Sequence, residues 1–248
     1  MKRAWPLLAI GAAAYLLVMV VTFPAARLVP LLERQVAGLS LHTVAGSVFS
    51  GTAAQLVYQG LDFGHLTWQV RPAGLLLGRL EFHIELTDPA NPGHANIAIT
   101  PWGNVYGRDV RLMLSPDRLV NHYSPVPVKT SGAMQLQIDT FKMAGGFPED
   151  IAGLLNWEDG VVLDPLEIIL GDVGMTLNSK EDLLVGSLVE GGRLEAAGDI
   201  QLSADGRYQV NLRLMPDNEM SDETLTALEM VGQVQSDSSL LFKTAGRL

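Results

Sequence analysis

The sequence predicts a mainly β protein, with an N-terminal transmembrane helix followed by an elongated, curled antiparallel β-sheet domain and a few short helices. Three observations support this prediction. Lys2 and Arg3 precede a run from Ala4 to Phe23 that contains no charged residue. From residue 41 onward, apolar and polar residues alternate with a period of two, and the chain contains 25 glycines that suit turns and bulges. Stretches with helical periodicity are few and short.

The apolar run is long enough to cross the roughly 30 Å of a bilayer core as one helix. Short basic segments stay on the cytoplasmic side, so we expect residues 1–3 to be a cytoplasmic tail, residues 4–24 to span the membrane and the rest to lie across it. A cleaved signal peptide is the main alternative. Its apolar core would be shorter, about 7–15 residues, and the sequence around Phe23-Pro24 is a poor cleavage site.

We expect a juxtamembrane amphipathic helix over residues 25–40, because Leu28, Leu31 and Leu32 fall at helical spacing. Pro30 would kink or restart this helix. Four later segments also have helical signals, from proline at the first turn or from a serine N-cap and a glycine stop. They are residues 72–77, 116–123, 148–155 and 221–232.

We expect residues 41–248 to form a β-rich domain, consisting either of two related lobes (41–145 and 146–248) or of one continuous sheet. Alternation with one apolar face is typical of an antiparallel sheet covered on one side, and Asp205-Gly206 is a strong hairpin signal. Few helices are available to cover that face, so a sheet that curls without closing would leave an apolar groove. Its candidate lining residues are Leu66, Trp68, Val70, Leu194 and Ile200.

Composition excludes several classes of function. The chain carries a net charge of −10, and without Lys2 and Arg3 the remainder carries 15 basic and 27 acidic residues. This balance argues against nucleic acid and anionic headgroups as ligands, although it permits contact with lipid tails. There is no cysteine, and the five histidines are not paired at metal-ligand spacing. We therefore expect no disulfide, metal or cofactor.

No catalytic residues are predicted either, so we expect a protein that is not an enzyme. The acidic pairs Glu149-Asp150 and Glu158-Asp159 are interpreted as solvated surface, and no serine lies in a Gly-x-Ser-x-Gly motif.

Three residues are candidates for contact with a partner. Trp102 follows a proline in a glycine-rich turn, which favours an exposed side chain. Arg71 and Arg79 bracket the short helical segment at 72–77, where each could pair with a carboxylate of this chain or touch a partner.

Several blocks, taken in order along the whole chain, resemble the type II secretion system protein N family. They are Val-Ala-Gly-Ser-Val-Phe-Ser-Gly-Thr-Ala at 44–53, Leu-Thr-Trp-Gln-Val-Arg-Pro at 66–72, Leu-Leu-Leu-Gly-Arg-Leu at 75–80, Gly-Gly-Arg-Leu at 191–194, Asp-Gly-Arg-Tyr at 205–208 and Leu-Met-Pro at 214–216. The resemblance implies an inner-membrane protein with a periplasmic domain, which contacts other secretion components in assembly or stabilisation.

The same resemblance implies an alternative function. Such proteins are similar to the AsmA-like group, whose members form elongated, curled sheets with an apolar channel linked to lipid movement. On this alternative the chain would be a lipid-binding or lipid-transfer module, with phospholipid held against the apolar face of the sheet.

Overall fold

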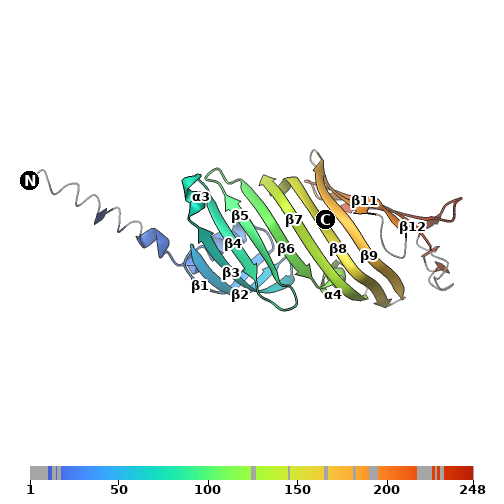
Figure 1. The fold of residues 1–248 in the computed structure, drawn as a ribbon, viewed down its shortest axis with the longest axis horizontal. Coiled ribbons are helices and arrows are strands. Elements are labelled where there is room, and N and C mark those ends of the chain that lie inside the picture. The colour runs from blue at the N-terminus through green and yellow to red at the C-terminus, as the bar shows by residue number, and fades with distance from the viewer. Residues whose placement is uncertain are drawn as a thin grey trace, which may run out of the picture.

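The computed structural model of the chain describes residues 11–12, 15, 18–123, 127–144, 146–164, 167–180, 183–189, 195–216, 225–226, 228–229 and 232–247. Within these residues fourteen strands form one sheet (Figure 1). The strands are β1 (Leu39–Gly46), β2 (Ser50–Tyr58), β3 (Leu61–Arg71), β4 (Leu80–Leu86), β5 (Gly93–Ile99), β6 (Val105–Leu114), β7 (Lys129–Ala144), β8 (Phe147–Asp164), β9 (Ile168–Lys180), β10 (Leu183–Val189), β11 (Glu195–Ser203), β12 (Arg207–Met215), β13 (Gln233–Val234) and β14 (Leu240–Arg247).

The strands pair in chain order from β1 to β12, followed by β14 and then β13 at the far edge. Every pairing is antiparallel, as expected when consecutive strands are joined by short turns. The predicted hairpin turn at Asp205-Gly206 is confirmed between β11 and β12, with Gly206 at φ +82°. The structure thus confirms a mainly β fold built on one antiparallel sheet.

The register of the sheet lines up apolar residues from strand to strand. One continuous row crosses ten strands, and adjacent members are direct cross-strand partners. The row consists of Val44, Ala53, Leu66, Leu86, Gly93, Leu112, Leu136, Leu155, Met175 and Leu188. Because side chains alternate between faces, this row defines one apolar face of the sheet, hereafter the apolar face.

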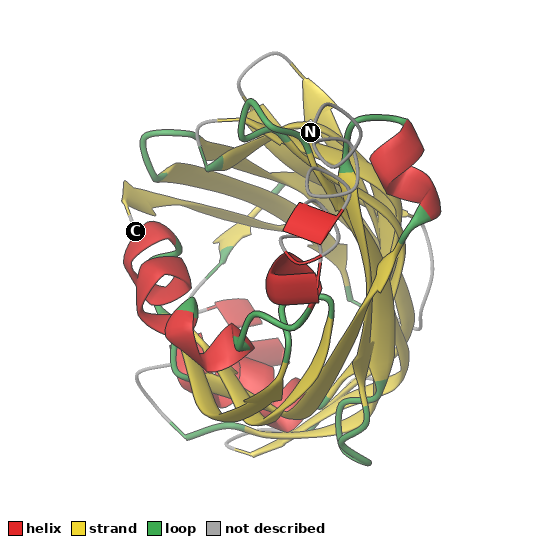
Figure 2. Ribbon diagram, turned by 90° about the vertical axis from the view of Figure 1, so that its left-hand side faces the viewer, coloured by secondary structure: helices red, strands yellow, loops and turns green. Residues whose placement is uncertain are grey.

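The sheet is a single layer with a thin core. The chain exposes 15764 Å², whereas a compact monomer of this mass would expose about 10,700 Å². Strands make up most of the molecule in Figure 2, and the helices are confined to short segments. Among the described residues the buried apolar side chains are Ala25, Ala53, Leu66, Val70, Ala98, Met134 and Leu240. Most of the apolar face is therefore only half-buried.

Short helices occur at two of the predicted places. Helix α3 (Ala73–Leu76) joins β3 to β4, and α4 (Pro116–Tyr123) joins β6 to β7. A helix at 148–155 was predicted from its proline and acidic start, and this prediction is wrong because the segment belongs to strand β8. Pairing with β7 decides the conformation: Ile151, Gly153 and Leu155 lie opposite Phe141, Ile138 and Leu136 on the apolar face.

The N-terminal region contains the short helices η1 (Ala25–Arg27) and α2 (Val29–Gln35). They occupy part of the range 25–40, in which strand β1 already begins at Leu39. Pro30 lies in the first turn of α2, where a proline is tolerated. No helix among the described residues is long and apolar enough to span a membrane. Of the expected span 4–24, residues 4–10, 13–14 and 16–17 lie outside the described residues.

Two other predictions fall partly or wholly outside the described residues. In the segment 221–232, residues 225–226 and 228–229 are helical, and residue 232 is the only other one described. Leu194, a candidate groove residue, is not among the described residues.

Candidate functional site

The apolar face is most tightly packed at β3, where three of the predicted groove residues lie together. Leu66 and Val70 are buried, and Trp68 between them is half-buried. Trp68 lies opposite Gly51 on β2 and Ile84 on β4. Its indole Nε1 donates a hydrogen bond to the carbonyl oxygen of Ser47 at 3.2 Å. A Cβ at position 51 would collide with the indole ring, so the ring lies directly over Gly51.

A second tryptophan repeats this arrangement in β8. The Trp157 indole Nε1 donates a hydrogen bond to the Ser131 carbonyl oxygen at 3.0 Å. Glycine again gives the ring its space, because a Cβ at Gly132 would lie 2.8 Å from Nε1 and one at Gly160 3.1 Å from Cδ2. Trp157 was not among the predicted groove residues, although its alternation with Ile151, Gly153 and Leu155 places it on the apolar face.

Ile200 lies on the same face but far from Trp68. It pairs with Gly186 on β10 and Val210 on β12, and it is half-buried. Strand β11 is eight strands from β3 in the sheet order. The predicted groove residues therefore share a face rather than one compact pocket.

The opposite face of β3–β6 carries a network of polar side chains. His83 Nδ1 lies 2.9 Å from Asn96 Oδ1, and His83 Nε2 lies 3.1 Å from Glu85 Oε1. Nearby, Asp109 lies 3.4 Å from His94 Nε2 and 3.3 Å from Arg111 Nε. These groups surround a shallow depression of about 540 Å³. We call this side of strands β3–β6 the polar face. Its mixed charges suit a protein partner better than a polyanion.

The two arginines that bracket α3 behave differently. Arg79 pairs with Glu81 (Nε to Oε1, 2.7 Å), and Arg108 approaches the same carboxylate at 3.5 Å. Arg71 is exposed, and its Nη2 lies 3.4 Å from His83 Nδ1. Among the described residues no carboxylate pairs with Arg71 within 4 Å. The Arg71 guanidinium thus lies exposed at the rim of the polar face, with no carboxylate partner among the described residues.

Helix α3 with the residue after it, and the turn between β5 and β6, expose large apolar side chains. Trp102 is 85% exposed in the turn between β5 and β6. Leu75, Leu76 and Leu77 are 50%, 91% and 70% exposed. These leucines were not among the predicted contact residues, although three consecutive leucines between Gly74 and Gly78 leave no polar side chain to face water.

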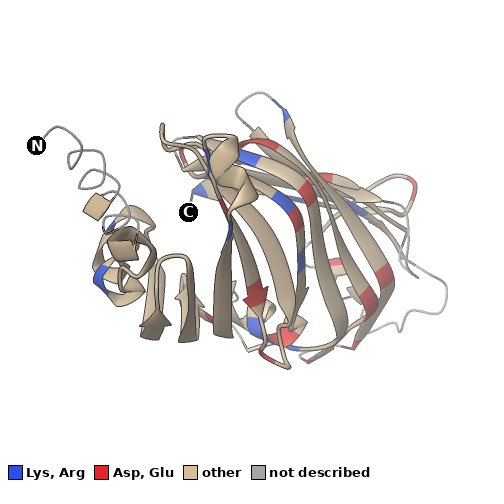
Figure 3. Ribbon diagram, turned by 60° about the vertical axis from the view of Figure 1, so that its left-hand side comes forward, with Lys and Arg blue, Asp and Glu red and all other residues tan. Residues whose placement is uncertain are grey.

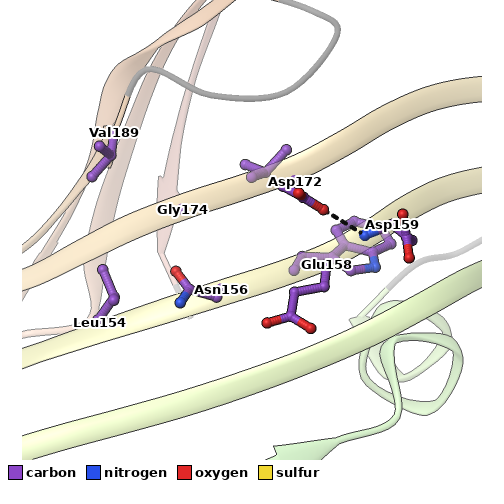
Figure 4. A pocket seen from close by; sticks show the side chains of 9 residues that line it. Leu154, Asn156, Glu158, Asp159, Asp172, Gly174 and Val189 are labelled. Carbon is purple, nitrogen blue, oxygen red and sulfur yellow. Dashed lines mark hydrogen bonds between the residues drawn. The ribbon is translucent and has the colours of Figure 1, made fainter.

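A second depression, of about 500 Å³, lies over β8 and β9 (Figure 4). Gly174 is among the residues that line it, and a Cβ there would lie 3.3 Å from Asn156 Oδ1 and 3.7 Å from Val189 Cβ. At its rim the Asp159 amide donates to Asp172 Oδ1 at 2.9 Å, and Asp159 has φ +48°. Glu158 and Asp159 are exposed, as predicted. No group of three or more potential metal ligands occurs among the described residues.

Known proteins resemble the chain over most of its length. Residues 37–241 match the family model described as type II secretion system (T2SS), protein N. A type II secretion system protein N from Aeromonas hydrophila is 25% identical over 254 residues, covering 100% of both chains. Another of that name, from Vibrio cholerae serotype O1, is 24% identical over 222 residues, covering 85% of this chain and 86% of the relative. No solved structure gives a significant match.

Proposed function

The chain belongs to the type II secretion system protein N family, and from this membership we propose that it is a non-enzymatic component of the type II secretion machinery. Residues 4–24 anchor it in the inner membrane, and residues 41–248 form a periplasmic domain that contacts other inner-membrane or periplasmic components. These contacts assemble or stabilise the export apparatus.

The observation that supports this proposal most strongly is the extent of the family match. It runs from residue 37 to residue 241, from just before the first strand into the last. The resemblance therefore concerns the whole sheet rather than one motif. The uncharged run from Ala4 to Phe23 supports the anchor, because a segment of that length and composition partitions into a bilayer.

The polar face is the proposed surface for protein contacts. It presents both signs of charge within a few ångströms, at Arg111 and Asp109, beside the imidazole of His94, and it adjoins the exposed Arg71. Such mixed patterns favour one partner orientation over others, because a misplaced partner would bring like charges together.

In-cell photo-crosslinking tests this proposal. A photoreactive residue at Gln69, exposed on the polar face, is expected to give adducts with secretion-system proteins. The matched control carries the same residue at Lys243, which is exposed at the far end of the sheet on β14. Adducts at 69 that are absent at 243 support a specific contact. Equal yields of unrelated adducts at both positions would contradict it.

A second candidate function, lipid binding, is favoured by the apolar face. Ten strands contribute to one apolar row, yet most of these side chains are only half-buried. A sheet that curls around this face would form a groove suited to acyl chains.

The position of α4 supports such a curl. The helix contacts both β3 and β7, which are four strands apart, or about 19 Å in a flat sheet. An eight-residue helix is only about 12 Å long.

Photoreactive residues at Trp68 and Ile200 distinguish the two functions. Phospholipid adducts at both positions, lost when Glu replaces a neighbouring apolar residue, would make lipid binding the primary function. Adducts confined to segments of this chain would mean that the apolar face is filled by its own side chains, and would exclude the lipid function.

A further inference from the structure

The strongest unassigned feature is a cluster of exposed apolar side chains at one end of the sheet: Leu75, Leu76, Leu77 and Trp102, hereafter the apolar edge. We propose that the apolar edge inserts into the phospholipid bilayer that holds residues 4–24, so that the sheet rests on the membrane through a second contact. This inference rests on the membrane anchoring proposed above and adds to it a membrane-facing side of the folded domain.

The strand topology places these side chains at the same end of the sheet. Helix α3 joins β3 to β4, and the turn at 100–104 joins β5 to β6. Both connections lie at the same end of the sheet, because β3 and β5 are two strands apart and run in the same direction. Their separation is about 10 Å. The four side chains thus lie on neighbouring connections at the same end of the sheet.

The N-terminal apolar run ends beside the apolar edge. The carbonyl oxygen of Phe23, the last residue of the run, accepts a hydrogen bond from the Val48 amide at 3.1 Å, and Pro24 forms an isolated bridge to Ser47. The next residue of that turn, Phe49, accepts from the Val70 amide at 2.6 Å. Val70 is two residues before Pro72, which precedes α3. The end of the run therefore meets the sheet at the end that carries the apolar edge.

The connections beside the apolar edge carry few charges. The turns at 47–49, 72–79 and 100–104 contain no Asp or Glu, and Arg79 is their only charged residue. Over the same strands, the connections at the opposite end carry Asp88 and Asp117; farther along the sheet, the end that carries the apolar edge has Asp205 in the β11–β12 turn. In Figure 3 the red acidic segments lie mostly on strands away from the N-terminal helices. A bilayer therefore meets little carboxylate at this edge despite the chain's overall acidity.

The geometry of the turns also suits shallow insertion. A Cβ added at Gly78 or Gly103 would meet no atom within 4 Å, so both turns project from the body of the sheet. Trp102 at the tip is of the residue type enriched at membrane interfaces, because its ring is apolar and its N–H can meet water or headgroups. A protein partner is the competing occupant, and the connection to the apolar run favours the bilayer.

The absence of cysteine makes a direct test simple. Single cysteines are introduced as Leu76→Cys at the apolar edge, Ala90→Cys in the exposed turn at the opposite end and Val18→Cys in the apolar run. Each full-length variant is labelled with an environment-sensitive fluorophore and reconstituted into vesicles of phosphatidylethanolamine and phosphatidylglycerol. Quenching by nitroxide-labelled acyl chains then reports contact with lipid.

We expect blue-shifted emission and strong nitroxide quenching at 18 and 76, and quenching several-fold weaker at 90. Adding Trp102→Ser should reduce the quenching at 76 and leave that at 18 unchanged. A label at 76 as weakly quenched as that at 90, with 18 embedded in lipid, would overturn the insertion of the apolar edge and leave the anchor intact. A water-exposed label at 18 would overturn the anchor and this inference together.

Discussion

Replacing Gly51 with alanine is expected to destabilise the N-terminal part of the sheet. Gly51 lies on β2 between Gly46 and Trp68. An added Cβ would collide with the Trp68 ring and would lie 2.5 Å from the carbonyl oxygen of Ala45. The ring can rotate away, but the Ala45 oxygen is backbone of the neighbouring strand and can move only by distorting the β1–β2 ladder.

The expected magnitude follows from three contributions. Overpacking a well-packed site costs about 1–3 kcal/mol. A displaced Trp68 ring loses its 3.2 Å hydrogen bond to Ser47, at a cost of about 1 kcal/mol. Removing a glycine from a strand offsets about 0.5–1 kcal/mol of this, because the unfolded chain loses conformational freedom. The net loss in the free energy of unfolding is about 1–3.5 kcal/mol.

Urea unfolding of the full-length chain in mild detergent, followed by far-ultraviolet circular dichroism, measures this loss. With a denaturant slope of about 2 kcal/mol/M, Gly51→Ala should lower the midpoint by about 1 M. The matched control is Gly174→Ala on β9, where the new Cβ would have contacts of 3.3 and 3.7 Å and the backbone is not left-handed. Its midpoint should stay the same or rise slightly. A Gly51→Ala midpoint no lower than that of Gly174→Ala would refute the packing argument.

Three further predictions concern other parts of the sheet. Trp157→Phe should cost about 1 kcal/mol by removing the hydrogen bond to Ser131 while keeping an aromatic ring over the glycines, and a urea midpoint equal to wild type would contradict this. Ile200→Glu should lower the thermal unfolding temperature, because it places a charge on the apolar face; Gln209→Glu, exposed on the other face, is the control. The hydroxyl and amide of Ser239 and the Arg213 guanidinium hold the pKa of Asp237 below its usual value of 3.8. The ionised carboxylate thus stabilises the fold at neutral pH, and this stabilisation is lost as the pH falls through the lowered pKa. Asp237→Asn should therefore be less stable than wild type at pH 7, and the difference should disappear in strong acid. A difference in stability that stays constant across the pH titration would refute the assignment.

The secondary structure of most strands could be predicted from the sequence because the apolar and polar residues alternate with the period of the β-strand. Leu66, Trp68 and Val70 were assigned to one face on this basis, and the structure places them there. The same logic was not applied to residues 151–157, where Pro148 and its acidic neighbours favoured a helix start. Local signals of that kind are worth less than the hydrogen bonds and side-chain contacts of a long strand pairing, and β7 provides those.

The candidate surfaces could be predicted only in part. The exposure of Trp102 followed from its place in a glycine-rich turn, whereas the exposure of Leu75–Leu77 was not predicted, because it depends on how α3 packs against the sheet. The pairing of Arg79 with Glu81, and the lack of such a pair for Arg71 among the described residues, depends on which side chains the strand register brings together.

The sequence alone determined that this protein is a mainly antiparallel β chain with one apolar face. It also determined short helices at 72–77 and 116–123, a hairpin at Asp205-Gly206 and an uncharged N-terminal run. Each of these features depends on residues close together in the chain. The tertiary structure decided the ten-strand apolar row, the tryptophan rings seated over glycines and the gathering of Leu75–Leu77 with Trp102 at one edge. Those features depend on the register between strands, which is set by side chains far apart in the sequence. A shift of one residue in the register would move every side chain of a strand to the other face of the sheet.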